Sequence, residues 1–444
     1  MKDGFLRVAA ATPKVRVADP QYNAQQIMDL IGQGYSRGVK LMVFPELCLT
    51  AYTCADLFGQ KALLRKAREE LDRIVRFTDG KDILVFLGLP WERDGKLYNA
   101  AIQKGRLLGI VPKRNLPNYS EFYEARNFCP GNERAVMTNW NGEKVPMGTN
   151  LLFKCKNMPE LTVAAEICED VWVPCPPSIR HALAGATVVV NCSASDETTG
   201  KDMYRHDLIC SQSARLVCGY VYANAGEGES TQDLVFGGQN IIAENGTCLV
   251  ESRRFINESI CADMDLERLD SERRRMSTFP DPAAAREEGG YLAVEFNLDA
   301  VLEDSPGSQN AQAVGSSQPG GDVLRYVDPA PFVPRDERQR NRRCEEILSI
   351  QAMGLKKRLE HTGCREAVIG LSGGLDSTLA LLVTVRAFDS LKIPRSGIHC
   401  ITMPCFGTTD RTYNNACTLA GKVGAELREI NIREAVTRHF EDIG

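Results

Sequence analysis

The sequence has few histidines, no closely spaced cysteine pair and no long hydrophobic segment. Only 5 of the 444 residues are histidine and no two cysteines have the C-x-x-C spacing, so a structural zinc site has little to be built from. The N-terminal residues contain no apolar run long enough for a secretory signal, and no other segment approaches the length of a membrane span. We therefore expect a cytoplasmic protein in which most of the 16 cysteines are reduced and buried.

Neither sign of charge is in strong excess. The chain has a formal net charge of −5, with 43% hydrophobic and 25% charged residues. Proteins that bind nucleic acid or anionic membranes need a basic patch, and the one basic run, RDERQRNRR at 335–343, carries its own acidic residues. The length and composition therefore predict a globular protein of two or three domains, with neither nucleic acid nor a membrane as a partner.

Short β-rich runs alternate with helical runs in the first part of the chain. Apolar runs of strand length occur at 6–12, 39–46, 82–90, 161–170, 186–195 and 219–226. Apolar residues recur at helical spacing in 23–38, 61–78, 178–185 and 205–217. This alternation predicts an α/β domain with a mostly buried sheet and helices outside. A β-hairpin is expected further on, because Asn245 and Gly246 are typical of a two-residue turn.

The composition changes after residue 302. Residues 303–322 are rich in glycine, serine and proline, which is typical of a linker. We therefore predict a first domain at 1–302, a linker at 303–335 and a second domain at 336–444.

The second domain contains the run EAVIGLSGGLDSTLALLVTV, which predicts a strand, a glycine turn and a helix. Gly373 and Gly374 permit backbone conformations in which consecutive N–H groups point at an anion. Asp376 can then hold a magnesium ion that bridges phosphates. The plainer interpretation is a tightly packed turn in which a serine caps the helix. The complete S-G-G-x-D-S-T run between a strand and a helix favours phosphate binding, although the lysine of a P-loop is absent.

Three residues of the first domain form a chemically coherent set: Glu46, Lys113 and Cys168. Taken singly, each has an ordinary structural explanation: Glu46 as a solvated residue at a strand end, Lys113 as part of a surface turn, and Cys168 as a small core residue. Together they supply a base for a cysteine nucleophile and a cation for an oxyanion, the latter assisted by the backbone N–H of Glu169. With so few histidines, a carboxylate is the expected proton acceptor.

These residues occur in the order FPE, PKRNLP and EICEDVW, which resembles the nitrilase, or carbon–nitrogen hydrolase, superfamily from the first strand to about residue 300. The resemblance implies a four-layer α-β-β-α sandwich with catalytic Glu46, Lys113 and Cys168. The S-G-G-x-D-S run resembles the ATP pyrophosphatase superfamily, which implies the start of a parallel-sheet α/β domain that binds ATP and Mg²⁺, the latter through Asp376. The implied ATP-binding residues are Gly370, Leu371, Ser372, Gly373, Gly374, Leu375, Asp376 and Ser377.

Further residues of the first domain match the hydrolase pattern by position. Glu124 resembles the second glutamate that supports the lysine. Tyr119 and Ser195 resemble glutamine-contacting positions, although ordinary loop packing explains them equally well. Tyr52 is close enough in sequence to Glu46 to line the pocket. Lys201 occupies a position where related sequences have arginine. A lysine ammonium offers the substrate carboxylate a single point charge, whereas an arginine guanidinium can form two parallel hydrogen bonds with it.

The pairing of these two domains implies an enzyme that hydrolyses glutamine and uses the ammonia in a second reaction. By this resemblance, the second domain adenylates nicotinic acid adenine dinucleotide (deamido-NAD) with ATP, and ammonia carried through a tunnel displaces AMP to give NAD. The expected partners are these small molecules and further copies of the chain, without a bound organic cofactor or a structural metal. Few residues follow Thr378, so we also expect the second domain to be incomplete.

Two alternatives stay open at this point. One is an amidase or carbamoyl hydrolase of the nitrilase group that carries a decayed second domain, although the intact SGGLDST run disfavours decay. The other is a nucleotide-responsive binding protein whose site-like residues are structural. Other glutamine-using ATP pyrophosphatases fit less well, because their glutaminase parts use an N-terminal cysteine or a cysteine–histidine pair.

Overall fold

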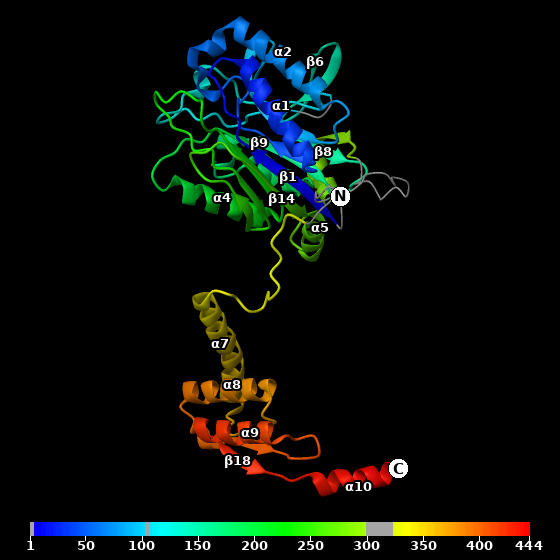
Figure 1. The fold of residues 1–444 in the computed structure, drawn as a ribbon, viewed down its shortest axis with the longest axis vertical. Coiled ribbons are helices and arrows are strands. Elements are labelled where there is room, and N and C mark those ends of the chain that lie inside the picture. Colours follow the sequence, from blue (N-terminus) through cyan, green and yellow to red (C-terminus); the bar gives the residue numbers. More distant parts are fainter. Residues whose placement is uncertain (1–3, 103–105, 299–322) are drawn as a thin grey trace, which may run out of the picture. The chain divides into compact units, whose positions relative to one another are not determined.

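The chain folds as two units, Met1–Tyr326 and Val327–Gly444, and each has its own hydrophobic core. The structure, a computed structural model, describes residues 4–102, 106–298 and 323–444 (Figure 1). The division falls inside the segment 303–335 that the sequence predicts as a linker, most of which lies outside the described residues. The predicted limits of that linker stay a prediction.

Two β-sheets pack face to face in the first unit. One has the strand order β14-β1-β2-β3-β4-β5 and the other β13-β12-β11-β10-β9-β8-β15. The first contains β1 (Phe5–Ala11), β2 (Leu41–Val43), β3 (Leu84–Arg93), β4 (Lys96–Ile102), β5 (Val111–Pro112) and β14 (Ser259–Asp265). The second contains β8 (Leu151–Cys155), β9 (Thr162–Ile167), β10 (Val188–Ser193), β11 (Gly219–Asn224), β12 (Ile241–Glu244), β13 (Thr247–Glu251) and β15 (Leu292–Phe296). A separate hairpin joins β6 (Val136–Trp140) to β7 (Glu143–Met147).

The alternation of side chains along the strands explains the layers. Val8 and Ala10 of β1 point into the core between the sheets, where they belong to one cluster with Val190 of β10. Ala9 and Ala11 point the other way and pack with the helices that cover the outer face. Both faces of the strand are thus buried, which is why the run reads as continuously apolar.

Helices cover the outer face of each sheet (Figure 1). The first sheet is covered by α1 (Pro20–Ser36) and α2 (Lys61–Thr78), and the second by α3 (Pro177–Leu183) and α4 (Lys201–Leu216). The remaining helices of the unit are α5 (Leu266–Arg275) and α6 (Pro282–Gly289). This arrangement confirms the predicted four-layer α-β-β-α sandwich.

Local sequence signals place several of these elements. The Asp19 carboxylate accepts a hydrogen bond from the Tyr22 N–H at 3.1 Å, and Pro20 occupies the first turn, so α1 begins where a capping residue and a proline favour it. The hairpin predicted at Asn245 and Gly246 is confirmed: both have positive φ (44° and 85°) and they join β12 to β13.

The second unit contains a three-stranded parallel sheet in the order β16-β17-β18. Its elements are α7 (Glu337–Thr362), β16 (Ala367–Gly370), α8 (Leu375–Leu391), β17 (Ile398–Thr402), α9 (Asp410–Val423), β18 (Glu426–Glu429) and α10 (Arg433–Ile443). Leu381 and Phe388 of α8 pack against Ile398 and Cys400 of β17 in its core. The strand, glycine turn and helix predicted in 366–385 are confirmed.

All sixteen cysteines are free, and seven of them are buried. The prediction that most would be buried is therefore wrong. The reason is partly the second unit, where Cys344 and Cys364 are exposed and Cys405 and Cys417 are half-buried. Within the described residues, no helix is both long enough and apolar enough to span a membrane.

Gly88 of β3 permits a close approach between that strand and the turn that follows β2. The Gly88 N–H donates to the Pro45 carbonyl at 3.1 Å, and the Gly88 carbonyl accepts from the Leu49 N–H at 3.2 Å. A Cβ at this position would lie 2.1 Å from the Leu47 nitrogen and 2.6 Å from the Glu46 Cα. Only glycine therefore fits without moving the turn that carries Glu46.

We expect Gly88→Ala to lower the free energy of unfolding of the first unit by about 3 kcal/mol or more, because the added methyl group overlaps main-chain atoms. Urea unfolding followed by tryptophan fluorescence measures this, since all three tryptophans of the chain lie in the first unit. Gly59→Ala is the matched control, because its added Cβ has no heavy atom within 4 Å. A Gly88→Ala protein as stable as that control would contradict the close approach.

Candidate active site

Glu46 lies in the turn after β2 and is fully buried. The residues bonded to it lie in strands of the two sheets or directly follow them. The sequence places it at the end of the strand, but β2 ends at Val43, and Pro45 lacks the N–H that would continue the ladder. The Glu46 Oε1 atom accepts hydrogen bonds from the Asn99 amide and, at 2.7 Å, from Lys113 Nζ. Its Oε2 atom accepts from the Ala194 N–H at 3.1 Å.

Lys113 follows β5 and is fully buried between two carboxylates. Its Nζ atom lies 2.7 Å from Glu46 Oε1 and 2.6 Å from Glu124 Oε1. The Tyr52 hydroxyl donates to the same Glu124 oxygen at 2.8 Å. The structure therefore brings together four residues from separate parts of the predicted site: Glu46, Tyr52, Lys113 and Glu124. The other Glu124 oxygen, Oε2, is buried and has no hydrogen-bond partner among the described residues.

Cys168 follows β9 directly and begins a short 3₁₀ turn, Cys168–Val171. Its φ of 42° lies in the left-handed region, which is strained for a residue with a side chain and recurs at functional sites. The Cys168 N–H donates to Asn191 Oδ1 at 3.0 Å. The Asp170 carboxylate accepts from the Ile167 N–H at 3.0 Å, which holds the turn closed.

Asp170 also joins the cysteine turn to the lysine segment. It is buried and accepts hydrogen bonds at 2.8 Å from both the backbone and the side-chain amide of Asn115, two residues after Lys113. The sequence analysis did not select Asp170, Asn99 or Asn191. For Asn99 and Asn191, the only sequence signal is a polar residue within a run of strand residues. That signal is the same for an active-site asparagine and for a core asparagine whose amide is hydrogen-bonded.

Burial and neighbouring charges shift the pKa values of Glu46, Cys168 and Lys113. Burial raises the pKa of Glu46 to about 7, although the neighbouring Lys113 ammonium acts to lower it. Burial also raises the pKa of the Cys168 thiol; Glu46 raises it further, and Lys113 opposes this. For Lys113, burial acts to lower the pKa, but Glu124 and Glu46 together hold it well above its usual value. The resting site thus holds a protonated thiol, a cation and a carboxylate that titrates near neutrality.

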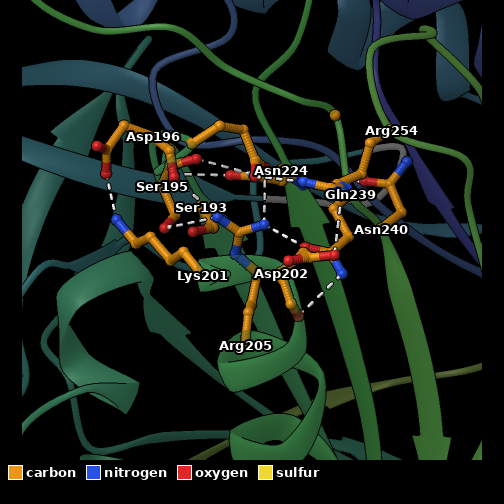
Figure 2. A network of polar contacts seen from close by, with 12 residues as sticks. Ser193, Ser195, Asp196, Lys201, Asp202, Arg205, Asn224, Gln239, Asn240 and Arg254 are labelled. Carbon is orange, nitrogen blue, oxygen red and sulfur yellow. Dashed lines mark hydrogen bonds and ion pairs between the residues drawn. The ribbon is translucent and has the colours of Figure 1, made fainter. Parts of the chain in front are cut away.

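The other three selected residues of this unit lie at the edge of the cluster. Tyr119 is 56% exposed, and its hydroxyl donates to Glu169 Oε1 at 2.8 Å, next to Cys168. Ser195 is buried, and Lys201 forms an ion pair with Asp196. Figure 2 shows the Lys201 ammonium directed at Asp196 in the same polar network as Ser195.

Arg205 of α4 organises that network and was not selected from the sequence. It is fully buried, and its guanidinium donates to Ser195 Oγ at 3.3 Å and to the Asp196 carbonyl at 2.9 Å (Figure 2). It also forms an ion pair with Glu197 at 2.8 Å. Nothing in the local sequence distinguishes this arginine from a solvated helix residue, because only the packing of α4 on the sheet buries it.

A pocket in the first unit reaches Glu124 from the side of the tyrosine. Its lining includes Tyr52, Phe122, Glu124 and Leu234. Cys168 is not among the lining residues, so this pocket adjoins the supporting glutamate and not the sulfur.

The predicted ATP loop lies in the second unit, between β16 and α8. Gly370 ends the strand, Leu371 is buried, and Gly374 precedes the first turn of the helix. The Ser372 hydroxyl accepts from the Gly374 N–H at 3.2 Å and contacts the Ser377 hydroxyl at 3.1 Å.

Gly373 has a φ of 79°, and a Cβ there would lie 1.9 Å from the Thr412 carbonyl oxygen, so close packing against α9 also requires glycine. Leu375 and Asp376 are exposed in the first turn of α8. Asp376 can supply one oxygen ligand to Mg²⁺, an ion that is commonly held by one or two carboxylates together with substrate phosphates.

A four-layer sandwich with a strained cysteine near a buried glutamate–lysine pair agrees with the carbon–nitrogen hydrolase class that the sequence resembles. Comparison with known families agrees: residues 7–274 match the carbon-nitrogen hydrolase family, and residues 347–443 match the NAD synthase family. The first match covers more than half of the chain, so the chain belongs to the carbon–nitrogen hydrolase family.

Similar proteins have the same two parts in the same order. The glutamine-dependent NAD(+) synthetase of Mycobacterium tuberculosis H37Rv is 41% identical over 452 residues, which is 99% of this chain and 64% of that protein. The protein of the same name from Aquifex aeolicus is 28% identical over 99% of this chain and 68% of its own length. The crystal structure of the synthetase from Cytophaga hutchinsonii aligns with a TM-score of 0.53 at 22% identity, over 99% of this chain and 67% of that one. The chain therefore spans about two thirds of the length of these relatives.

We expect Lys113→Met to destabilise the first unit by about 3–5 kcal/mol at pH 8, because it leaves two carboxylates buried without their cation. The loss should be smaller at pH 5, since Glu46, whose pKa is raised by burial to about 7, is then neutral. Urea unfolding at both pH values, followed by tryptophan fluorescence, measures the difference. Lys14→Met removes the cation of an exposed ion pair and should leave the unfolding midpoint unchanged. A loss for Lys113→Met that does not depend on pH would argue against the paired carboxylates.

Proposed function

We propose that the first unit hydrolyses glutamine to glutamate and ammonia, and that the chain belongs to an enzyme that uses this ammonia for the ATP-dependent synthesis of NAD. The observation that carries the proposal is the buried contact of Lys113 with Glu46 and Glu124, near the strained Cys168, in a chain that continues into an NAD synthase-like unit. The similarity to several glutamine-dependent NAD(+) synthetases supports the choice of substrate.

In the first half of the reaction, Glu46 takes the proton of the Cys168 thiol, and the sulfur attacks the carbon of the substrate amide. The carbonyl oxygen becomes an oxyanion, which the Lys113 ammonium and the N–H of the residue after the cysteine stabilise. Protonated Glu46 then returns the proton to the departing nitrogen, which leaves as ammonia. The product of this half is a thioester on Cys168.

In the second half, water replaces ammonia as the reacting group. Glu46 accepts a proton from water, the hydroxide attacks the thioester carbon, and the thiol is restored as glutamate leaves. Glu124 holds Lys113 in place through Oε1, and its unpartnered Oε2 can accept a hydrogen bond from the substrate amide or from ammonia. The Tyr52 hydroxyl fixes the orientation of that carboxyl group.

We assign Tyr119, Ser195 and Lys201 to the recognition of glutamine. Tyr119 stands at the exposed side of the cysteine turn, and Lys201 supplies the positive charge that the α-carboxylate requires. Asp196 already pairs with that ammonium, so a bound carboxylate would share it. A single ammonium also holds a carboxylate less specifically than a guanidinium does.

The second unit would bind ATP in the turn Gly370–Ser377, with Asp376 as a ligand of the accompanying Mg²⁺. The consecutive N–H groups at the start of α8 suit a phosphate, and the synthetase from Acinetobacter baumannii, whose structure is a complex with ADP, supports the use of an adenine nucleotide. In the complete reaction, ATP would adenylate deamido-NAD with release of pyrophosphate, and ammonia would displace AMP.

The pairing of Lys201 with Asp196 favours one alternative, an amidase that acts on amides without an α-carboxylate. In that case simple aliphatic amides would be hydrolysed and glutamine would not. The same assay on both kinds of amide distinguishes the two functions.

We expect glutamate release from glutamine by the wild-type chain and none from Cys168→Ala, measured with a coupled glutamate dehydrogenase assay in the absence of nucleotide. Cys175→Ala, which removes an exposed cysteine from the same region, is the matched control and should retain activity. Normal turnover by Cys168→Ala would falsify the assignment of the nucleophile, and activity on simple amides alone would select the amidase.

The pH dependence of this hydrolysis should follow the ionisation of Glu46. A carboxyl group with a pKa near 7 is protonated, and cannot accept a proton, below that pH. We therefore expect kcat/KM to fall by about tenfold per pH unit on the acidic side of pH 7. Far-UV circular dichroism at each pH controls for unfolding. A rate that stays constant from pH 8 to pH 5 would remove Glu46 from the role of base.

A further inference from the structure

A second cluster of reactive side chains lies on the outer side of the seven-stranded sheet, where α4 packs beside β13. It contains His206 and Cys210 of α4 and Cys248 of β13, all half-buried. His206 and Cys210 are four residues apart, so they share one face of the helix. None of the three belongs to the active site described above.

The three ligand-type atoms have the separation that a tetrahedral metal ion requires. The Cys210 sulfur lies 3.7 Å from His206 Nε2, and all three atoms lie within 4.8 Å of one another. Around a zinc ion with Zn–S near 2.3 Å and Zn–N near 2.0 Å, neighbouring ligand atoms are roughly 3.5–3.8 Å apart. Small rotations of the side chains therefore bring the three atoms onto one ion.

The imidazole of His206 is oriented as it is in known zinc sites. Its Nδ1 atom lies 2.7 Å from Glu251 Oε2, which leaves Nε2 facing the sulfurs. The other Glu251 oxygen accepts a hydrogen bond from Gln239 Nε2 at 2.5 Å, so the carboxylate is itself held. A carboxylate behind a ligating histidine fixes the ring and increases the basicity of the metal-binding nitrogen.

We propose that His206, Cys210 and Cys248 bind a zinc ion that ties α4 to the β12–β13 hairpin. Two thiols lose their protons to solvent when the ion binds, so the site holds two thiolates and one neutral imidazole. The side chain of His206 is 36% exposed, which leaves room for water as the fourth ligand.

The proposed ion would also support the glutamine side of the first unit. Gln239 contacts both Glu251 and the Arg205 guanidinium, and Arg205 in turn holds Ser195 (Figure 2). A continuous chain of hydrogen bonds therefore runs from the histidine ligand to the network that contains Lys201. The ion would hold the helix on which both Arg205 and Lys201 lie.

A disulfide between Cys210 and Cys248 is the competing interpretation. It accounts for the closeness of the two sulfurs, but it gives no role to the histidine or to its anchored carboxylate. Both cysteines are free in the structure.

Zinc content after reconstitution tests the proposal. The 444-residue chain is purified under reducing conditions, incubated with excess Zn²⁺ and passed over a chelating resin that removes weakly bound metal. Its zinc content is then measured by elemental mass spectrometry. We expect one equivalent of zinc in the wild type and in Cys175→Ser, and loss of that equivalent in Cys210→Ser and in Cys248→Ser. No zinc in the wild type, or an undiminished equivalent in both cysteine variants, would overturn the proposal.

A second measurement does not depend on the variants folding. The wild-type chain is alkylated with iodoacetamide with and without Zn²⁺, and labelled peptides are quantified by mass spectrometry. Zinc should slow the labelling of Cys210 and Cys248 by at least about tenfold while the labelling of exposed Cys175 stays unchanged. Equal labelling with and without zinc, or recovery of a Cys210–Cys248 disulfide from protein prepared without reductant, would refute the metal site.

Discussion

A buried ammonium between two carboxylates is the constraint on which the rest of the first unit depends. Lys113 has no contact with solvent, and its charge is tolerable there only because Glu46 and Glu124 lie at hydrogen-bond distance. Glu46 in turn depends on the lysine, because burial raises the pKa of this carboxyl group and the Lys113 ammonium acts to lower it. The loops that carry these residues must therefore keep one geometry, and the proposed hydrolysis relies on that same geometry.

The two sheets hold that cluster together from several directions. Gly88 lets β3 approach the Glu46 turn, Asn191 of β10 accepts the Cys168 N–H, and Asp170 joins the cysteine turn to the segment after Lys113. These contacts restrain the backbone at the places where the reacting groups emerge. Two hydrogen bonds, from the Cys168 N–H to Asn191 and from the Ile167 N–H to Asp170, hold the turn in which Cys168 has its strained φ.

The helix α4 connects two regions with different chemistry. In its first two turns, Lys201 pairs with Asp196 and Arg205 bonds to Ser195, whereas His206, the residue after Arg205, and Cys210 lie beside Cys248 of β13. Gln239 bridges them, because its amide contacts both the arginine and the carboxylate behind the histidine. The surroundings of His206 and of Ser195 are therefore joined through the side chains of Glu251, Gln239 and Arg205.

The sequence by itself determined the alternation of strands and helices, the Asn245–Gly246 turn and the glycine turn before α8, because these follow from periodicity and from residues with special backbone preferences. It also marked Glu46, Lys113 and Cys168 as candidates through their motifs. Only the tertiary structure decided that Asn99, Asn191 and Asp170 bond to these residues or to their segments, that Arg205 holds Ser195, and that Cys248 meets His206 and Cys210. The physical reason is that spacing along the chain reveals neighbours within one element, whereas strand order and helix packing bring distant residues together and bury their polar groups.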